Sequence, residues 1–206
     1  MEPVTKIQFS EREYQLVSNP DWILTKHIII KKVNSFFGEL IDIMKKFEPS
    51  DPKVSNFLKT KNGKISKGEN YEGLPYVILD YPNFFSNQNI FAIRTMFWWG
   101  NFFSITLHLK GEYFNRSKSH TDALLNYIKE KDYFLGINKN EWEHHFRPNN
   151  YKGKEFLKAM KPEDISEMEF LKIGKYFPLD QLENIQENLI KAFQELLECP
   201  AIICRN

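Results

Sequence analysis

A period of two in the apolar pattern of residues 90–110 constrains the fold more than any other feature of the sequence. The runs "IFAIRTMFWW" and "FFSITLHLK" flank Gly100-Asn101, a favourable dipeptide for a two-residue hairpin turn. Successive side chains of a strand point to opposite faces, so a hairpin here presents two different surfaces. The segment therefore predicts an antiparallel hairpin with one face on a hydrophobic core.

The turn also predicts which side chains of the hairpin share a face, because pairing register and face are coupled. With Gly100-Asn101 as a two-residue turn, the core face receives Trp98, Met96, Arg94 and Ala92 together with Phe103, Ile105, Leu107 and Leu109. The other, half-polar face receives Trp99, Phe97, Thr95 and Ile93 together with Phe102, Ser104, Thr106 and His108. In this register Arg94 and His108 point to opposite faces of the sheet.

Helical patterns lie on both sides of the hairpin. Apolar residues at helical spacing predict a long helix over residues 19–47, capped by Asn19 and with Pro20 in its first turn. A similar stripe predicts a final helix over residues 178–198. Between the hairpin and this helix, short helices are predicted for "NEWEHHF", "YKGKEFLKAM" and "KPEDISEMEF".

Two further segments precede the hairpin. The first, "KTKNGKISKGENYEG", predicts a solvated loop, since it lacks the glycine spacing and the Lys-Ser/Thr pair of a phosphate-binding loop. The second, "LPYVILDYP", has the composition of a strand. Strands in the middle and helices at both ends indicate the α+β class. We expect a single domain, residues 1–206, whose central antiparallel sheet carries a long N-terminal and a long C-terminal helix on one face.

The composition of the chain excludes several classes of partner. Lys and Arg number 28 against 27 Asp and Glu, so no global field attracts nucleic acid or an anionic membrane. The charged, proline-containing start is unlike a signal peptide, and the longest apolar runs are too short to span a bilayer. Cys199 and Cys204 are too few for a disulfide framework. We expect a cytoplasmic protein, monomeric or homodimeric, without nucleic-acid or membrane partners.

The signals for a metal are weak. On a helix, Glu141 and His145 would stand at the i,i+4 spacing of a metal-binding pair, which His108 and His120 could complete. Incidental histidines on a surface helix are the favoured interpretation, because a metal needs three or four converging ligands. We therefore expect neither a bound metal nor a cofactor.

An arginine on an apolar face needs a partner, since removing water from its guanidinium costs several kcal/mol. If the strand at 74–82 pairs antiparallel with 90–99, Asp80 lies near Arg94. One interpretation is a structural ion pair, or an arginine whose stem packs while its head reaches water. The other is a clamp on the carboxylate or phosphate of a small anionic ligand, which suits the bidentate guanidinium fork. We favour the structural interpretation.

The adjacent Trp98 and Trp99 pose a similar choice. Stacked aromatic rings receive nucleobases or a flat ligand. Single-strand binders add a basic groove, however, and arginine and lysine are sparse between residues 95 and 109. Packing in the core or in an interface is therefore the default. The candidate ligand-binding residues are accordingly Arg94, Asp80, His108, Trp98 and Trp99.

The order of the segments along most of the chain can be compared with that in other proteins. A long helix ending in "KKFEP" is followed by "YEGLPY", by "SITLHLKGEYF", by "FLKAM" and by a terminal helix ending in "AFQELL". This order and its amphipathic pattern resemble conserved bacterial proteins known only as domains of unknown function. The resemblance implies an α+β fold and a cytoplasmic location, and it implies no particular activity.

Two classes of function stay open. The sequence has no Gly-x-Ser-x-Gly, His-Glu-x-x-His or dinucleotide-binding motif. One hypothesis is a protein that binds a small molecule or a partner in a pocket beside the aromatic sheet. The alternative is a hydrolase or transferase acting on a small anionic substrate, with Arg94 holding charge and His108 exchanging protons. We favour binding, because these two residues are expected on opposite faces.

Overall fold

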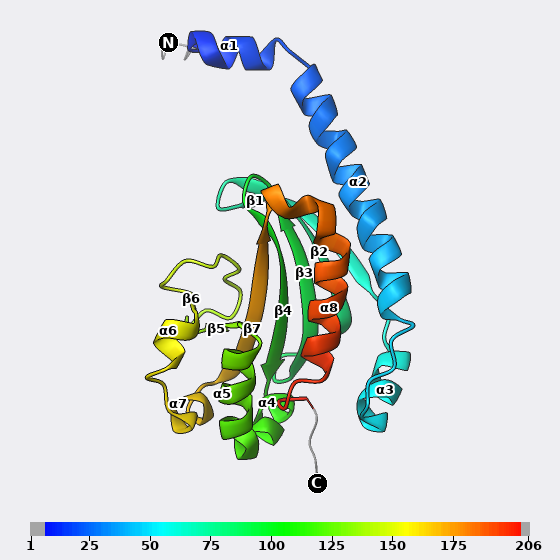
Figure 1. Cartoon of the computed structure of the whole chain (residues 1–206). Helices are drawn as coiled ribbons and strands as arrows, with labels where there is room; N and C mark the ends of the chain where they lie inside the picture. The colour runs from blue at the N-terminus through cyan, green and yellow to red at the C-terminus, as the bar shows by residue number, and fades with distance from the viewer. Residues whose placement is uncertain (1–6, 203–206) are drawn as a thin grey trace.

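The computed structural model describes residues 7–202 and has a seven-stranded antiparallel sheet at its centre (Figure 1). Across the sheet the strands follow the order β1 (Lys64–Tyr71), β2 (Leu74–Phe85), β3 (Ile90–Trp98), β4 (Phe102–Lys110), β7 (Phe170–Pro178), β5 (Phe134–Gly136) and β6 (Tyr151–Lys152). The helices are α1 (Glu11–Val17), α2 (Asp21–Met44), α3 (Pro52–Lys59), α4 (Glu112–Asn115), η1 (Arg116–His120), α5 (Thr121–Glu130), α6 (Lys154–Leu157), α7 (Pro162–Ser166), η2 (Leu179–Asn184) and α8 (Ile185–Leu197). The predicted α+β class is confirmed.

Helices α2 and α8 cover one face of the sheet (Figure 1). The Asn19 side chain accepts a hydrogen bond from the Asp21 N–H at 2.9 Å, so α2 begins where the sequence predicts. The buried stripe of α2 is Ile30, Val33, Phe37, Leu40 and Met44. That of α8 is Leu189, Ala192, Phe193, Leu196 and Leu197. The final helix is shorter than expected, because residues 179–184 form the 3₁₀ turn η2.

The β3–β4 hairpin is present, but its register differs by one residue from the predicted one. Its loop has three residues, and the Asn101 N–H donates to the Trp98 carbonyl at 3.1 Å. Gly100 takes a φ of +70°, a conformation that favours glycine. Trp98 therefore pairs with Phe102. A shift of one residue reverses the faces of one strand relative to the other. The predicted faces of the β4 side chains are therefore confirmed, whereas those of the β3 side chains, Arg94 among them, are wrong.

In the observed register, the face under α2 and α8 carries Phe91, Ile93, Thr95 and Phe97 together with Phe103, Ile105, Leu107 and Leu109. The opposite face, called the outer face below, carries Ala92, Arg94, Met96 and Trp98 together with Phe102, Ser104, Thr106 and His108. Arg94 and His108 thus lie on the same face, contrary to the sequence-based expectation. The argument that separated them no longer holds.

Three other segments differ from their expected structure. The lysine-rich segment predicted as a loop forms the edge strand β1, where lysines discourage pairing with other chains. Residues 140–146, expected as a helix, form an irregular segment instead. Strand β7 has no counterpart among the predicted elements, yet it pairs with β4 along its whole length.

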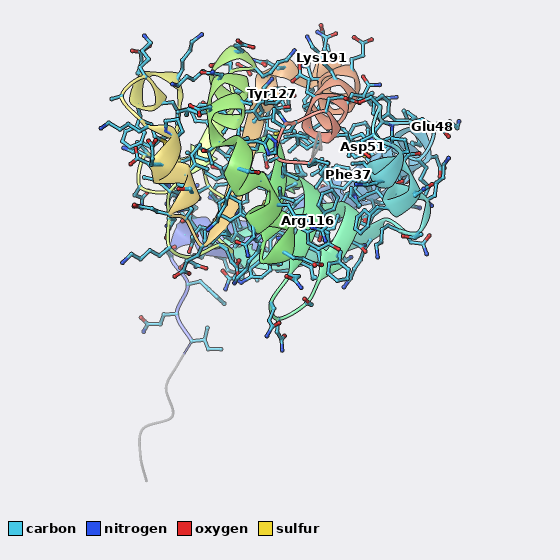
Figure 2. All side chains as sticks on the ribbon, turned by 90° about the horizontal axis from the view of Figure 1, so that it is seen from below. Phe37, Glu48, Asp51, Arg116, Tyr127 and Lys191 are labelled. Carbon is cyan, nitrogen blue, oxygen red and sulfur yellow. The ribbon has the colours of Figure 1, made fainter. Side chains whose placement is uncertain are left out.

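Phe37, labelled in Figure 2, provides a test of the helix layer. Its side chain is fully buried and meets the Phe103 ring edge-on, with 6.2 Å between the ring centroids. Phe37→Ala should lower the free energy of unfolding by about 3–5 kcal/mol, measured by urea titration, because it leaves a cavity in the core. Lys31→Ala, on the exposed side of α2, is the control and should change it by less than about 0.5 kcal/mol. Equal effects of the two substitutions would contradict this packing.

Candidate functional site

The outer face of the sheet divides into an apolar and a polar half. The apolar half is a small core of its own, made by Ile78, Met96, Trp98 and Phe102. The polar half, named here the polar cluster, consists of Asp80, Arg94, His108, Lys110 and Lys172. Residues 137–150, the covering segment, contact it through Glu141, Glu143 and His144. Burying charged side chains costs more free energy of folding than burying apolar ones, so the presence of these charges calls for an explanation.

Arg94 and Asp80 form the predicted ion pair. They face each other across β2 and β3, and the guanidinium donates from Nε to Oδ1 at 2.7 Å and from Nη2 to Oδ2 at 2.9 Å. Nη1 donates to Nε2 of His144 at 3.1 Å, which requires this ring to be neutral with its proton on Nδ1. Burial, followed by the charges of Lys172 and Arg94, holds the pKa of His144 well below its usual value. The pair and the covering segment are thus joined.

His108 and Lys110 share one carboxylate of the covering segment. The His108 Nε2–H donates to Oε2 of Glu141 at 3.2 Å, and Lys110 Nζ donates to Oε1 at 2.8 Å. Burial, and then the cations Lys172, Arg94 and Lys110, lower the pKa of His108 to about 3. This ring is therefore neutral at pH 7.

Lys172 holds the covering segment on the sheet. Its Nζ donates to the backbone carbonyls of Glu141, at 2.8 Å, and of Glu143. The residue is only 3% exposed, and burial together with the charge of Arg94 lowers the pKa of Lys172 to about 7. A lysine with such a pKa exchanges its proton near neutral pH, a property common at functional sites.

Tyr71, at the end of β1, is a second anchor of the covering segment. Its hydroxyl accepts hydrogen bonds from the N–H groups of His144 at 2.7 Å and His145 at 3.1 Å, and donates to Glu143 Oε2 at 3.1 Å. Burial raises the pKa of Tyr71 to about 12. Nδ1 of His145 is buried and has no hydrogen-bond partner within residues 7–202. Such an atom costs free energy unless a water or a ligand satisfies it.

Trp142 forms the solvent-facing rim of the polar cluster. Its ring is half exposed and lies 5.7 Å from the His108 ring and 6.0 Å from the guanidinium carbon of Arg94. The exposed Phe85 ring lies 6.2 Å from Trp142 and 5.8 Å from the same guanidinium carbon. The Arg94 side chain keeps 17% of its surface exposed, so solvent reaches it at this rim.

The two tryptophans of the hairpin lie away from the polar cluster. Trp98 is 3% exposed, and its Nε1–H donates to the Tyr71 carbonyl at 3.3 Å within the apolar half. Trp99 packs against the core on the helix side. Both tryptophans are thus packed against other apolar side chains, which is the role that the sequence analysis favours for them.

A half-open cavity of about 580 Å³ lies on the helix side, between α3, α4 and η1. Figure 2 labels two residues of its lining, Asp51 and Arg116. Its volume suits a small ligand, and its walls include the rings of Phe57, Phe91 and Tyr113. The cavity does not adjoin the polar cluster. Its charged residues Asp51, Lys53 and Arg116 are exposed or half-buried, whereas Asp80, His108 and Lys172 of the polar cluster are buried. The polar cluster is therefore the stronger candidate site.

The sequence identified Asp80, Arg94 and His108 but missed Lys110 and Lys172. It named Glu141 beside His108 only as a possible metal ligand on a helix, whereas Glu141 contacts His108 and Lys110 from an irregular segment. Lys172 does carry a local signal, because it interrupts the apolar run "FLKIG". Its partners lie in the covering segment, about thirty residues earlier in the chain. Contacts of this kind depend on tertiary structure and leave no pattern in the sequence.

Comparison with protein-family models, with curated proteins and with solved structures finds no match to the chain. The resemblance to conserved bacterial proteins of unknown function therefore stays an expectation. Within residues 7–202, no group of three or more His, Cys, Asp and Glu side chains could hold a metal ion. In the same range, no helix combines the length and the apolar character needed to cross a bilayer.

The bidentate pair predicts a strong coupling between Arg94 and Asp80. Arg94→Met leaves the Asp80 carboxylate buried without its partner and should lower the free energy of unfolding by about 3–5 kcal/mol. Adding Asp80→Asn removes that charge and should recover most of the loss. A double-mutant cycle by urea unfolding measures the coupling. An Arg94→Met variant as stable as the parent would show that the pair is not structural.

The low pKa of His108 predicts a loss of stability in mild acid. An unfolded histidine takes up a proton near pH 6.5, whereas folded His108 does so near pH 3. Between these values the unfolded state binds the additional proton, so stability present at pH 7 decreases as the pH falls. At pH 5 the contribution of His108 to this decrease is about 2 kcal/mol.

His108→Gln should therefore flatten the pH dependence, measured by urea unfolding at pH 5, 6 and 7. His27→Gln, on the exposed side of α2 and outside the polar cluster, is the matched control. If the free energy of unfolding changes with pH as steeply in the His108→Gln variant as in the parent, His108 is not the cause of the pH dependence.

Proposed function

We propose that the protein binds a small anionic ligand, a carboxylate or a phosphate, at the polar cluster. One observation carries the proposal. Arg94 and Lys110 have carboxylate partners in Asp80 and Glu141, whereas the ammonium of Lys172 donates to backbone carbonyls and forms no ion pair within residues 7–202. A bound anion would supply Lys172 with a counter-charge, and the guanidinium and ammonium groups would supply charge-assisted hydrogen bonds.

The protonation states support the same conclusion. Burial is the largest cause of the lowered pKa of His108 and of Lys172, and the neighbouring cations lower both further, Lys172, Arg94 and Lys110 at His108 and Arg94 at Lys172. Positively charged groups that lie close together repel each other, and a negative charge placed near them is stabilised. An anion would raise the pKa of Lys172, so binding above pH 7 would include the uptake of a proton.

The rim supports a ligand that also has a flat or apolar part. Trp142 and Phe85 are exposed aromatic residues beside the most accessible side of Arg94. Rings placed beside a charged group hold ligands that combine an apolar body with an anionic end. An aromatic or aliphatic carboxylate, or a phosphate ester, has this combination.

A second candidate function is catalysis on an anionic substrate by a hydrolase or transferase. The observation in its favour is that Arg94 and His108 lie on one face and both contact Trp142. Lys172, with a pKa of about 7, is available to exchange a proton at neutral pH, and the neutral ring of His108 can form hydrogen bonds with a substrate. Turnover of p-nitrophenyl phosphate or p-nitrophenyl acetate, abolished by His108→Gln, would favour this candidate.

A cytoplasmic location belongs to the same proposal, in keeping with a chain of two cysteines and with the resemblance described above. The near-neutral charge of the chain supports a small ligand and gives no support to nucleic acid as a partner.

Titration calorimetry with sulfate tests the proposal, because the charge of sulfate stays constant between pH 6 and 9. Lys110→Met should weaken binding by about tenfold or more, as expected for a lost charge-assisted hydrogen bond. Lys131→Met, which removes one exposed charge on the helix side, is the matched control and should bind like the parent. Affinity should decrease as the pH rises from 6.5 to 8.5, because Lys172 loses its proton.

Equal sulfate affinities of the Lys110→Met and Lys131→Met variants would contradict a site at the polar cluster. A sulfate affinity that does not change with pH would show that Lys172 is not part of the binding site.

A further inference from the structure

The N-terminal part of the chain projects away from the sheet (Figure 1). We name residues 7–28 the arm; it comprises α1, the corner that follows it and the first two turns of α2. Every residue of the arm is partly or fully exposed. The buried stripe of α2 begins only at Ile30, so the arm contributes little to the core described above.

The arm nevertheless has its own ordered geometry. A capping box joins Ser10 and Glu13 at the start of α1. At the corner, the Trp22 Nε1–H donates to the Leu16 carbonyl at 3.1 Å. Lys26 forms an ion pair with Glu69 of β1 at the base of the arm. The apolar surface of the arm is therefore presented in a defined shape, and little ordering is needed before it binds.

Large apolar side chains dominate the surface of the arm. Eight of them are between 47% and 82% exposed, namely Ile7, Phe9, Tyr14, Leu16, Val17, Trp22, Leu24 and Ile28. Together they expose roughly 1,000 Å² over the two sides of the arm. A standard interface buries about 800 Å² on each partner, so a contact through the arm is of the order that a dimer needs.

These side chains occupy two sides of the arm. On one side, Phe9, Leu16, Val17, Trp22 and Ile23 line a groove of about 500 Å³. Leu24 and Ile28 lie one turn apart on the opposite side of α2. A two-fold contact brings the same surface of both copies together, so crossed arms pack Leu24 and Ile28 of each copy against those of the other.

The charges of the arm also favour a second copy. Its three acidic residues outnumber its two basic ones by one: Glu11, Glu13 and Asp21 against Arg12 and Lys26. An arm of this charge does not attract an anionic lipid surface, which binds helices rich in lysine and arginine. Mixed charges of both signs permit contact between two copies without strong repulsion.

We propose that the protein is a homodimer in which the arms of two copies pack against each other around a two-fold axis. This contact buries the side of each arm that carries Leu24 and Ile28. Leu24 and Ile28 belong to its centre, because they are apolar, about half exposed and turned away from the sheet.

Light scattering after size exclusion tests the dimer with the full chain at 1–100 μM. The parent should have twice the chain mass of 24.6 kDa. The double variant Leu24→Gln/Ile28→Gln keeps good helix formers and should run as a monomer, with dimer affinity reduced at least about a hundredfold. The matched control Phe156→Gln/Leu182→Gln removes two similarly exposed apolar side chains from the body and should stay dimeric.

A parent that is monomeric at 100 μM would overturn the proposal, and so would a Leu24→Gln/Ile28→Gln variant that dimerises like the parent. Cosedimentation of a monomeric parent with vesicles of phosphatidylcholine and phosphatidylglycerol, lost in this double variant, would assign the arm to a lipid surface instead. An unchanged far-ultraviolet circular dichroism spectrum shows that the variants are folded.

Discussion

The three-residue loop between β3 and β4 requires Gly100 at a positive φ and pairs Trp98 with Phe102. Every side chain of the hairpin takes its face from this pairing, because strands alternate sides. Arg94 thereby meets Asp80 on the outer face, and His108 joins them from the next strand. With a loop shorter by one residue, either Arg94 or His108 would lie under α2 and α8. The loop length therefore determines whether the polar cluster exists.

The two faces of the sheet are stabilised in different ways. Under α2 and α8 the contacts are apolar, and burying each large side chain contributes roughly 1.5–3 kcal/mol. The polar cluster instead desolvates several charges, and ion pairs often recover no more than that cost. Gly174 of β7 shows how closely the outer face is packed, since a Cβ there would lie 2.8 Å from the Ile105 carbonyl. The helix-side core thus offsets the cost of the charged face.

Sequence patterns predicted the elements whose periodicity is long and regular. The α+β class, the beginning of α2 and the Asp80–Arg94 pair follow from helical spacing and from antiparallel pairing. The pattern does not distinguish a two-residue from a three-residue loop at Gly100, because glycine suits both. The covering segment has no periodicity at all, and the contacts of Lys172, rather than any local propensity, hold it in place. Its role could therefore not be read from the sequence.

The proposed ligand site and the proposed dimer contact use separate parts of the molecule. The arm is tied to the sheet through Lys26 and Glu69, on the edge strand β1. The polar cluster lies on β2, β3, β4 and β7, and solvent reaches it beside Trp142. Paired arms would therefore leave this rim open, and assembly need not compete with binding. Since α2 supplies both the free end of the arm and the buried stripe, a dimer contact would also restrain the helix that covers the core.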